Sequence, residues 1–564
     1  MRGFEGSKGM WMNAMKQVLA GLLLCVLATP ALAQVTVLTA HRIHTMDTNQ
    51  PQAQAMAYDA SGKILALGDA ASLLQRYPAA RRLDVGAATV VPGLIDAHGH
   101  LPSLGMSFLR VDLNGTRSKE EILTRLKTFA ATLPKGAWLT GRGWDQNDWP
   151  EQAFPTAADL DAAFPDRPIW LRRVDGHAGW ANSAALRAVK RDLSGSWQPD
   201  GGVIRRDARG RPDGVFIDNA MDLMDATVPA PDAATLEHAL ELAMHAAVAD
   251  GLTGVHDAGI TLEELRAYQH LADQGKLPLR VYAMAFGDGP ALDWLCANGL
   301  YRHPSGRLQM RTVKLFADGA LGSRGAALLQ DYSDDHGNRG LYVTSPEAMA
   351  AATAKARRCG VQVATHAIGD RGIRMTLDAY AHALGTDSGS DHRWRIEHVQ
   401  VLAPEDLPRL VQLHLVASMQ PTHATSDMPW AEARLGPQRV VWAYAWRKVR
   451  DAGVPLALGS DFPVESPDPR LGLYAAVTRE DAQGNPPGGW YPDEKLTAFE
   501  ALRGFTLGAA YAGFAENEIG SLAVGKRADF VVLAQDPLAV PEAQLRTLAV
   551  KATYVDGKPV FEAP

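Results

Sequence analysis

Eight short apolar segments, separated by stretches with helical periodicity, constrain the fold of this chain more than any other feature. Such alternation is typical of βα units that build a parallel sheet. Eight of them match the strand count of a TIM-type barrel. We therefore predict an α/β protein with a (β/α)8 TIM-type barrel, whose strands are 89–97, 253–257, 280–285, 311–317, 362–367, 394–398, 416–420 and 455–460.

The two ends of the chain differ from the middle because they are rich in short strands and turns. We predict that residues 34–91 and 515–564 form one small β domain, and that residues 92–514 form the barrel domain. The first two barrel strands are much farther apart than a βα connection requires. Residues 101–233 are therefore predicted to be a large insertion after barrel strand 1, placed to act as a lid.

Residues 1–33 have the pattern of a secretory signal peptide. Lys16 precedes an apolar run at 18–28, and a small-residue cleavage site follows at 31–33. We expect cleavage after Ala33 and a periplasmic or secreted protein without a membrane span after signal removal. An uncleaved anchor is the alternative.

Charge and cysteine content exclude other classes of function. The net charge is -7 and the chain has no long basic run, so no nucleic acid partner is expected.

Cys296 and Cys359 lie in different barrel segments and would remain after cleavage of the signal. Two buried free thiols are the preferred interpretation, a disulfide the alternative. A thiolate metal site is excluded because the cysteines are not closely spaced.

Histidines and an aspartate stand where predicted strands end. The strand that ends in His98-Gly99-His100 places two imidazoles on one face, since residues i and i+2 of a strand point the same way. The other strand ends carry His366, His398 and Asp461. Because the carboxyl ends of barrel strands meet at one rim, these side chains predict a site for divalent metal ions, with zinc as the default.

Lys314 is an unusual residue for an apolar strand. It could form an ion pair with a carboxylate such as Asp318. In the interpretation we prefer, its desolvated amine is deprotonated and takes up CO2, and the resulting carbamate bridges two cations.

The sequence resembles the amidohydrolase superfamily, and within it the YtcJ-like group that includes N-substituted formamide deformylases (amidohydrolase family 3). The resemblance covers nearly the whole mature chain and is carried by PGLIDAHGH (92–100), VKLFADGALGSR (313–324), THAIGD (365–370), RIEH (395–398), GSDFPV (459–464) and GSLAVGKRADFVVL (520–533). It implies that the small β domain is a β-sandwich.

The resemblance also implies a role for each ligand position. One divalent ion would be bound by His98, His100 and Asp461, and a second by His366 and His398. Carboxylated Lys314 would bridge them. Asp461 would also be the catalytic acid–base group.

Four further residues are candidates for substrate contacts. His423 follows strand seven, and Arg324 follows strand four in a glycine-rich loop. Trp144 and His177 lie in the insertion. The alternatives are a structural role for His423, a surface salt bridge for Arg324 and packing of the insertion's own core for the tryptophans.

These features together predict a metal-dependent hydrolase that cleaves a non-peptide carbon–nitrogen bond of a small amide or formamide. A mononuclear deaminase and an ester or lactone hydrolase are alternatives within the superfamily. A catalytically silent binding or regulatory protein is the alternative from another class. A homodimer is a reasonable expectation.

Overall fold

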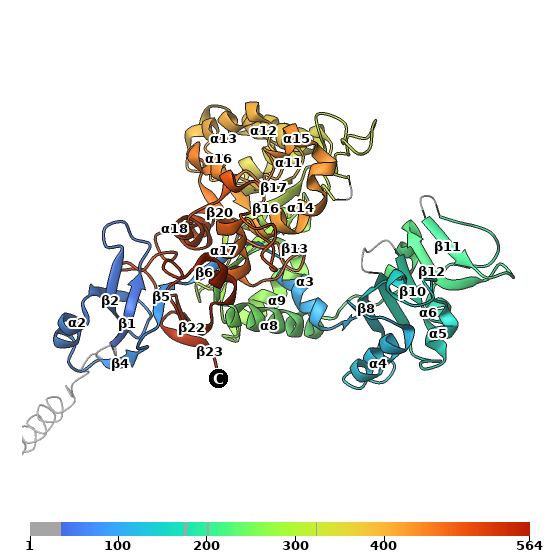
Figure 1. Cartoon of the computed structure of the whole chain (residues 1–564), viewed down its shortest axis with the longest axis horizontal. Coiled ribbons are helices and arrows are strands. Elements are labelled where there is room, and N and C mark those ends of the chain that lie inside the picture. Colours follow the sequence, from blue (N-terminus) through green and yellow to red (C-terminus); the bar gives the residue numbers. More distant parts are fainter. Residues whose placement is uncertain (1–34, 174–177, 200–201, 323) are drawn as a thin grey trace, which may run out of the picture.

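The computed structural model describes residues 35–173, 178–199, 202–322 and 324–564, so the predicted signal peptide and His177 lie outside the described residues. A parallel eight-stranded barrel forms the centre of the molecule, as predicted (Figure 1). Its strands are β6 (Leu94–Gly99), β13 (Leu252–Ile260), β14 (Arg280–Phe286), β16 (Leu308–Phe316), β17 (Gln362–Ala367), β18 (Arg395–His398), β19 (Val416–Met419) and β20 (Leu456–Leu458). The short strand β15 (Tyr301–Arg302) pairs with β16.

Helices follow the strands and cover the outside of the barrel (Figure 1). The longer ones are amphipathic, and their apolar faces join the strands in the largest hydrophobic core. The helices after the insertion are α8 (Ala233–Ala249), α9 (Leu262–Asp273), α10 (Pro290–Asn298), α11 (Pro346–Arg358), α12 (Asp370–Leu384), α13 (Leu407–Gln412), α14 (Pro421–Leu435), α15 (Pro437–Val440), α16 (Trp446–Asp451), α17 (Pro469–Thr478), α18 (Ala498–Arg503) and α19 (Ala509–Ala512). Of the helices in the described ranges, none is long and apolar enough to cross a membrane.

The barrel closes between β20 and β6, the two ends of the hydrogen-bonded strand order. Asp96 on β6 accepts a hydrogen bond from the backbone N–H of Ser460 at 3.1 Å and one from its hydroxyl at 2.6 Å. The N–H of Asp461 donates to the carbonyl of His98 at 2.6 Å. These contacts hold the chain after β20 beside the His-Gly-His segment.

Strands from both ends of the chain form one mixed eight-stranded sheet. The predicted first barrel strand, 89–97, is divided at Gly93, and this corrects our expectation. Its first part pairs with β1 and β21 in the terminal sheet, and only β6 belongs to the barrel. A Cβ at Gly93 would lie 2.1 Å from the Thr253 hydroxyl, so the crossing between the two sheets requires glycine. The sheet contains β1 (Thr36–His44), β2 (Gln52–Tyr58), β3 (Ile64–Gly68), β4 (Arg81–Asp84), β5 (Thr89–Pro92), β21 (Phe530–Leu533), β22 (Val550–Val555) and β23 (Lys558–Glu562), with α2 (Ala70–Arg76) beside it.

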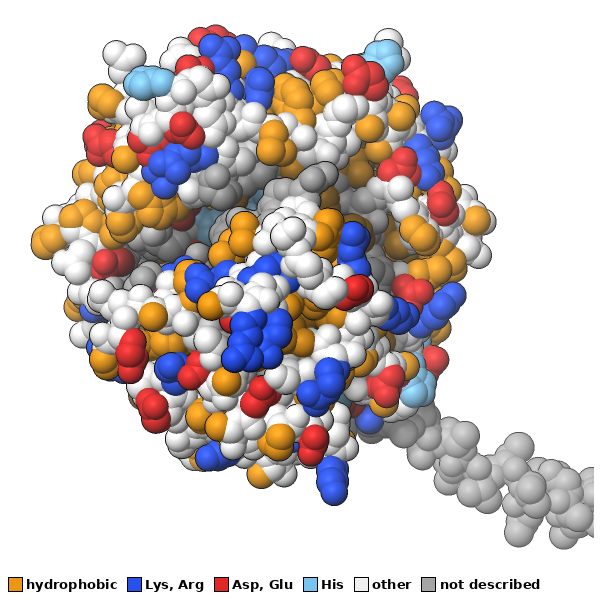
Figure 2. All heavy atoms as spheres, turned by 90° about the vertical axis from the view of Figure 1, so that its right-hand side faces the viewer, with side chains coloured by type: hydrophobic (Ala, Val, Ile, Leu, Met, Phe, Trp, Pro, Cys, Tyr) orange, Lys and Arg blue, Asp and Glu red, His pale blue; other side chains and the backbone are white. Residues whose placement is uncertain are grey.

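The insertion is a separate lobe with its own hydrophobic cores. The chain leaves β6 at its carboxyl end and enters the insertion through α3 (Leu101–Phe108), which packs on α8. Two clusters of buried side chains between 111 and 228 contain residues of this lobe alone. Figure 2 shows the lobe in front, with a hollow beside it in which histidine side chains are visible. Its elements are β7 (Val111–Asp112), α4 (Lys119–Ala130), β8 (Leu139–Trp144), α5 (Ala157–Asp161), β9 (Ile169–Arg173), β10 (Ala178–Ala181), α6 (Ser183–Ala188), β11 (Gly202–Arg206), β12 (Pro212–Asp218) and α7 (Asp222–Asp225).

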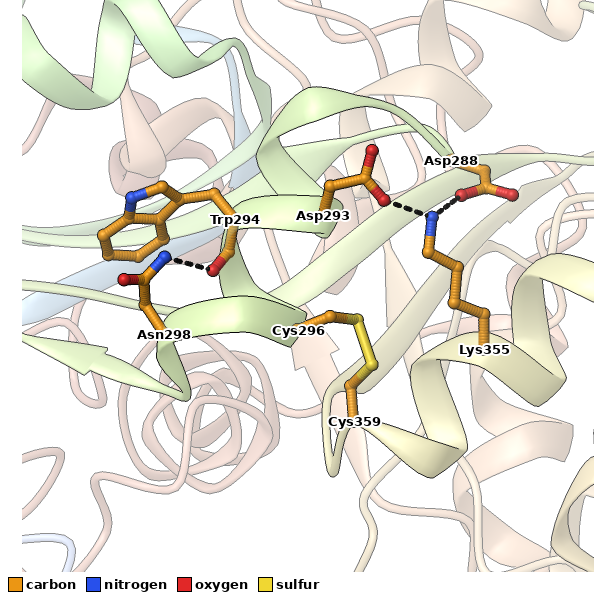
Figure 3. Close-up of a disulfide and its surroundings, with 7 residues drawn as sticks. All are labelled: Asp288, Asp293, Trp294, Cys296, Asn298, Lys355 and Cys359. Carbon is orange, nitrogen blue, oxygen red and sulfur yellow. Dashed lines mark hydrogen bonds and ion pairs between the residues drawn. A yellow bond between two sulfur atoms is a disulfide. The ribbon is translucent and has the colours of Figure 1, made fainter.

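A disulfide joins Cys296 in α10 to Cys359 at the end of α11 (Figure 3). The preferred interpretation of two free thiols is therefore wrong. The two helices follow β14 and β16, which are neighbours in the barrel, so cysteines 63 residues apart in sequence meet on its surface. Lys355 of α11 lies close by and pairs with Asp288 at 2.5 Å and Asp293 at 2.6 Å.

A buried ion cluster joins the barrel to the terminal sheet. Arg280, the first residue of β14, donates to both carboxylate oxygens of Asp529 at 2.6 and 2.9 Å, and to Asp556 at 2.6 Å. Asp529 precedes β21 and Asp556 follows β22. The Arg280 side chain is 10% exposed and the Asp529 side chain 3% exposed. Each charge is therefore stabilised mainly by the other, because water does not reach them freely.

We expect Arg280→Met to lower the free energy of unfolding by about 3–5 kcal/mol, because it leaves the buried Asp529 carboxylate without its cationic partner. Urea denaturation followed by circular dichroism measures this loss. The matched control is Arg302→Met, which removes a half-exposed arginine that pairs with Glu518 and should cost less than about 1 kcal/mol. Equal stability of the two variants would contradict the assignment of this cluster as a structural clamp.

Asp257 on β13 gives the fold a pH-dependent stability. Burial raises the pKa of its carboxyl to about 8, although the Tyr268 hydroxyl donates to it at 2.5 Å and lowers the pKa. The folded protein thus holds a proton that the unfolded chain releases near pH 4, so stability falls as the pH rises from about 4 to about 8.

In Asp257→Asn we expect this part of the pH dependence to disappear. Relative to the wild type, the variant should have a higher thermal midpoint at pH 8.5 than at pH 5. The corresponding change in the free energy of unfolding is up to about 1.4 kcal/mol for each pH unit between about 4 and about 8. Differential scanning calorimetry at both pH values makes the comparison. If the thermal midpoints of the wild type and the variant changed by the same amount between the two pH values, the Asp257 carboxyl would not be neutral in the folded protein.

Candidate metal centre

The structure brings the six predicted ligand residues to the carboxyl end of the barrel. Each comes from, or directly follows, one of five strands: β6, β16, β17, β18 and β20. The imidazoles lie in a row, with ring centroids 5.5 Å apart for His98–His100, 4.9 Å for His98–His398 and 4.6 Å for His398–His366. Ligand atoms of His98, His398 and Asp461 lie within 4.8 Å of one another, close enough to bind one ion.

The His-Gly-His segment depends on the small residue at its centre. A Cβ on Gly99 would lie 2.3 Å from the Phe462 ring, so a larger residue would displace the loop that carries Asp461. The Nε2 atoms of His98 and His100 lie 3.6 Å and 3.1 Å from Asp461 Oδ1. Both imidazoles therefore approach the same carboxylate oxygen.

Two ligand residues adopt left-handed backbone conformations. The φ angle is +75° at His398 and +63° at Asp461, values that residues other than glycine rarely adopt. Each residue stands where a strand ends, and the turn there carries its side chain to the mouth. Local strain of this kind is concentrated at functional sites.

Lys314 is 1% exposed, and its amine lies 3.1 Å from Nε2 of His98. Burial lowers its pKa to about 8. Asp318, the alternative partner, instead accepts backbone N–H groups of Ala327, Ile368 and Gly369 at 2.8–3.0 Å. No carboxylate lies within salt-bridge distance of the Lys314 amine among the described residues.

The donor set fits divalent metal ions. The buried Nε2 of His366 has no hydrogen-bond partner within the described ranges, and an orphaned imidazole nitrogen in a row of imidazoles is an open ligand position. Burial and the nearby Lys314 lower the pKa of His98 to about 4 and that of His366 to about 3. These imidazoles are therefore neutral at physiological pH, which is the form that binds metals.

A buried polar chain behind the first histidine escaped the sequence analysis. Nδ1 of His98 lies 2.5 Å from Glu397, whose carboxylate accepts two hydrogen bonds from Arg395 at 2.7 and 2.9 Å. Arg395 also contacts Nδ1 of His256 at 2.8 Å. All four side chains are buried. The RIEH segment could have indicated this chain of contacts. Arg395 and Glu397 are two residues apart and lie on one face of a buried strand, where charged residues are rare.

Of the four candidate substrate contacts, His423 lies at the site. Its Nε2 is 3.2 Å from Asp461 Oδ2, and its Nδ1 is 3.2 Å from Glu465. Burial opposes its charge, but the hydrogen bonds to Asp461 and Glu465 dominate and raise its pKa to about 10. His423 is thus an imidazolium that neutralises and orients the Asp461 carboxylate.

Arg324 and Trp144 have other partners in this structure, and His177 lies outside the described residues. Arg324 forms a salt bridge with Asp334 at 2.9 Å, which is the alternative role considered for it. Trp144 is fully buried in the insertion, where its indole N–H donates to the Leu171 carbonyl at 2.8 Å. It has no exposed surface to offer a substrate, so we withdraw it from the candidates.

The architecture and this row of ligands define a metal-dependent hydrolase of TIM-barrel fold. The chain belongs to the amidohydrolase family, whose sequence pattern matches residues 83–561. It is 35% identical over 530 residues to the putative amidohydrolase YtcJ of Bacillus subtilis, covering 92% of this chain and 98% of YtcJ. It is 31% identical over 541 residues to the N-substituted formamide deformylase of Arthrobacter pascens, covering 91% and 96% of the two chains.

A solved structure shares the architecture of this chain. An uncharacterized metal-dependent hydrolase from Pyrococcus horikoshii superimposes with a TM-score of 0.77 at 29% identity, over 90% of this chain and 99% of that one. The comparison supports metal-dependent hydrolysis as the class of reaction.

Proposed function

We propose that this protein hydrolyses a non-peptide carbon–nitrogen bond in a small amide or formamide. The convergence of four imidazoles, Lys314 and Asp461 at the barrel rim carries the proposal. Similarity to an N-substituted formamide deformylase supports the choice of bond.

In this proposal two divalent ions, zinc in the first instance, occupy the site. His98, His100 and Asp461 would hold one, His366 and His398 the other, and Lys314 would bridge them as a carbamate. The lowered pKa of the Lys314 amine favours its reaction with CO2, which requires the neutral amine. When bound, such ions acidify water and polarise a carbonyl group.

The residues of the chain then move and place protons. Asp461 accepts the proton of the attacking water at its carboxylate and returns it to the leaving nitrogen. Burial acts against its charge, but hydrogen bonds to His100 and His423 keep the Asp461 pKa well below its ordinary value. The carboxylate is therefore ionised before the water attacks.

Metal analysis combined with substrate assays tests the proposal. We expect two equivalents of metal per chain, cleavage of simple formamides or aryl amides, and loss of activity with a chelator that added Zn2+ reverses. Lys314→Ala should lose at least one equivalent, whereas Lys276→Ala, an exposed lysine that pairs with Glu241, should keep both. One equivalent in the wild type would favour the deaminase alternative. Cleavage of esters or lactones but of no amide would contradict the proposed bond.

We also propose that the protein is exported to the periplasm or secreted. The Cys296–Cys359 disulfide supports this location, because disulfides persist in oxidising compartments. Cell fractionation and amino-terminal sequencing test it: a mature chain beginning at Gln34 is expected, and a cytoplasmic chain beginning at Met1 would contradict export.

A further inference from the structure

Two phenylalanines lie beside the candidate metal centre. Phe286 is the last residue of β14 and Phe316 the last residue of β16, and their ring centroids are 5.4 Å apart. The Phe316 centroid lies 5.9 Å from the His366 ring and 4.9 Å from the Lys314 amine. The pair therefore borders the site on its β14–β16 side.

The strand register places both rings on the inner side of the barrel mouth. Phe316 is two residues beyond Lys314, on the same face of β16, and Phe286 is level with Lys314 in the adjacent strand. Two and four residues before Phe286, Met284 and Tyr282 belong to a buried cluster with residues of β13 and β17. The two phenylalanines thus follow the buried inner layer of the barrel at the rim where active sites form.

The position of these rings requires an explanation, because they remain accessible. Phe286 is 52% exposed and Phe316 is partly exposed. Nearby, Leu341 and Val343 are each 57% exposed, and the Val343 N–H donates to the carbonyl of Ala317, the residue after Phe316. Clusters of exposed apolar side chains next to a polar site are typical of ligand-binding surfaces.

The two sides of the mouth differ in chemistry. On the side of β6 and β20, Asp461 contacts His100 and His423. On the side of β14 and β16, the aromatic pair lies against the metal centre. A substrate whose scissile polar group sits at the ligands would extend any substituent in this direction over the two rings.

We propose that Phe286 and Phe316 form a subsite for an apolar, preferably aromatic, substituent of the substrate. The rings are tilted by 51°, an arrangement that lets a third ring stack on one and meet the edge of the other. The inference rests on the proposed function, since it takes the scissile group to be at the metal centre.

The test compares substrates that differ only in the substituent. For the metal-loaded enzyme we expect kcat/KM to be about 10- to 100-fold higher for N-(2-phenylethyl)formamide than for N-methylformamide, from burial of the phenyl group. Phe286→Ala and Phe316→Ala should each reduce this ratio several-fold, and Phe316→Leu less than Phe316→Ala. The matched control, Phe499→Ala, removes an exposed phenylalanine of α18 and should leave the ratio unchanged.

A binding measurement separates the two proposals. Calorimetric titration of the metal-loaded protein with 3-phenylpropanoate and with acetate should show tighter binding of the aromatic acid, and the preference should fall in both alanine variants. That result without any formamide cleavage would support the subsite while contradicting the proposed bond. Equal kcat/KM ratios in wild type and variants, or equal affinities for the two acids, would overturn the subsite.

Discussion

Replacing Asp461 by Asn is expected to lower kcat by about 10²- to 10⁴-fold, the contribution typical of a general acid–base group. The amide keeps the size of the carboxylate and an oxygen ligand, but it cannot accept the proton of the attacking water. His423 lies 3.2 Å from Asp461 and would face a neutral partner in the variant, so the site would also lose this charge pair. Steady-state kinetics on the substrate identified by the assays above gives the measurement.

Two controls separate a chemical effect from a structural one. The variant should retain most of its bound metal by elemental analysis and should unfold at nearly the wild-type temperature. Asp378→Asn, which changes a 67% exposed carboxylate on α12 that pairs with Arg409, should have wild-type kcat. If Asp461→Asn turned over normally while binding metal, another group would have to move the proton.

Replacing Glu397 by Gln is expected to weaken metal binding by about 10- to 100-fold, the effect typical of losing the partner that orients a metal-binding histidine. The Glu397 carboxylate contacts Nδ1 of His98 at 2.5 Å and thereby leaves Nε2 free for the ion. Glutamine lacks the charge that holds both this imidazole and the Arg395 guanidinium. A chelator competition titration with Zn2+ measures the change.

The same substitution should lower the free energy of unfolding by about 3–5 kcal/mol, because Arg395 is fully buried and loses its counter-ion. Glu405→Gln is the matched control: Glu405 is 76% exposed and pairs loosely with Arg374, so neither metal affinity nor stability should change. Wild-type metal affinity in Glu397→Gln would show that His98 is oriented without the carboxylate.

Much of the barrel could be predicted because its strands are buried on both faces and read as apolar runs of the right length. The candidate ligand residues could be proposed for a related reason, since they are polar and stand in or at the ends of these runs. The division of 89–97 was missed because both halves are apolar, and the crossing at Gly93 appears only when the two halves pair with strands of different sheets.

Contacts between distant segments explain the other differences. The pairing of Cys296 with Cys359 follows from the adjacency of β14 and β16, which depends on the order of strands in the sheet. Trp144 was judged by residue type, whereas its burial depends on how the insertion packs. Phe286 and Phe316 are ordinary strand residues in the sequence, and only the register shows that their rings reach the mouth.

The independent packing of the insertion has a consequence for how such an enzyme can diversify. Its buried clusters between 111 and 228 share no residue with the core that supports the ligand-bearing strands. Substitutions, and even changes of length, in this lobe can therefore accumulate while the core beneath the candidate ligands keeps its packing. Selection can act on the lobe and on the barrel core as two separate traits.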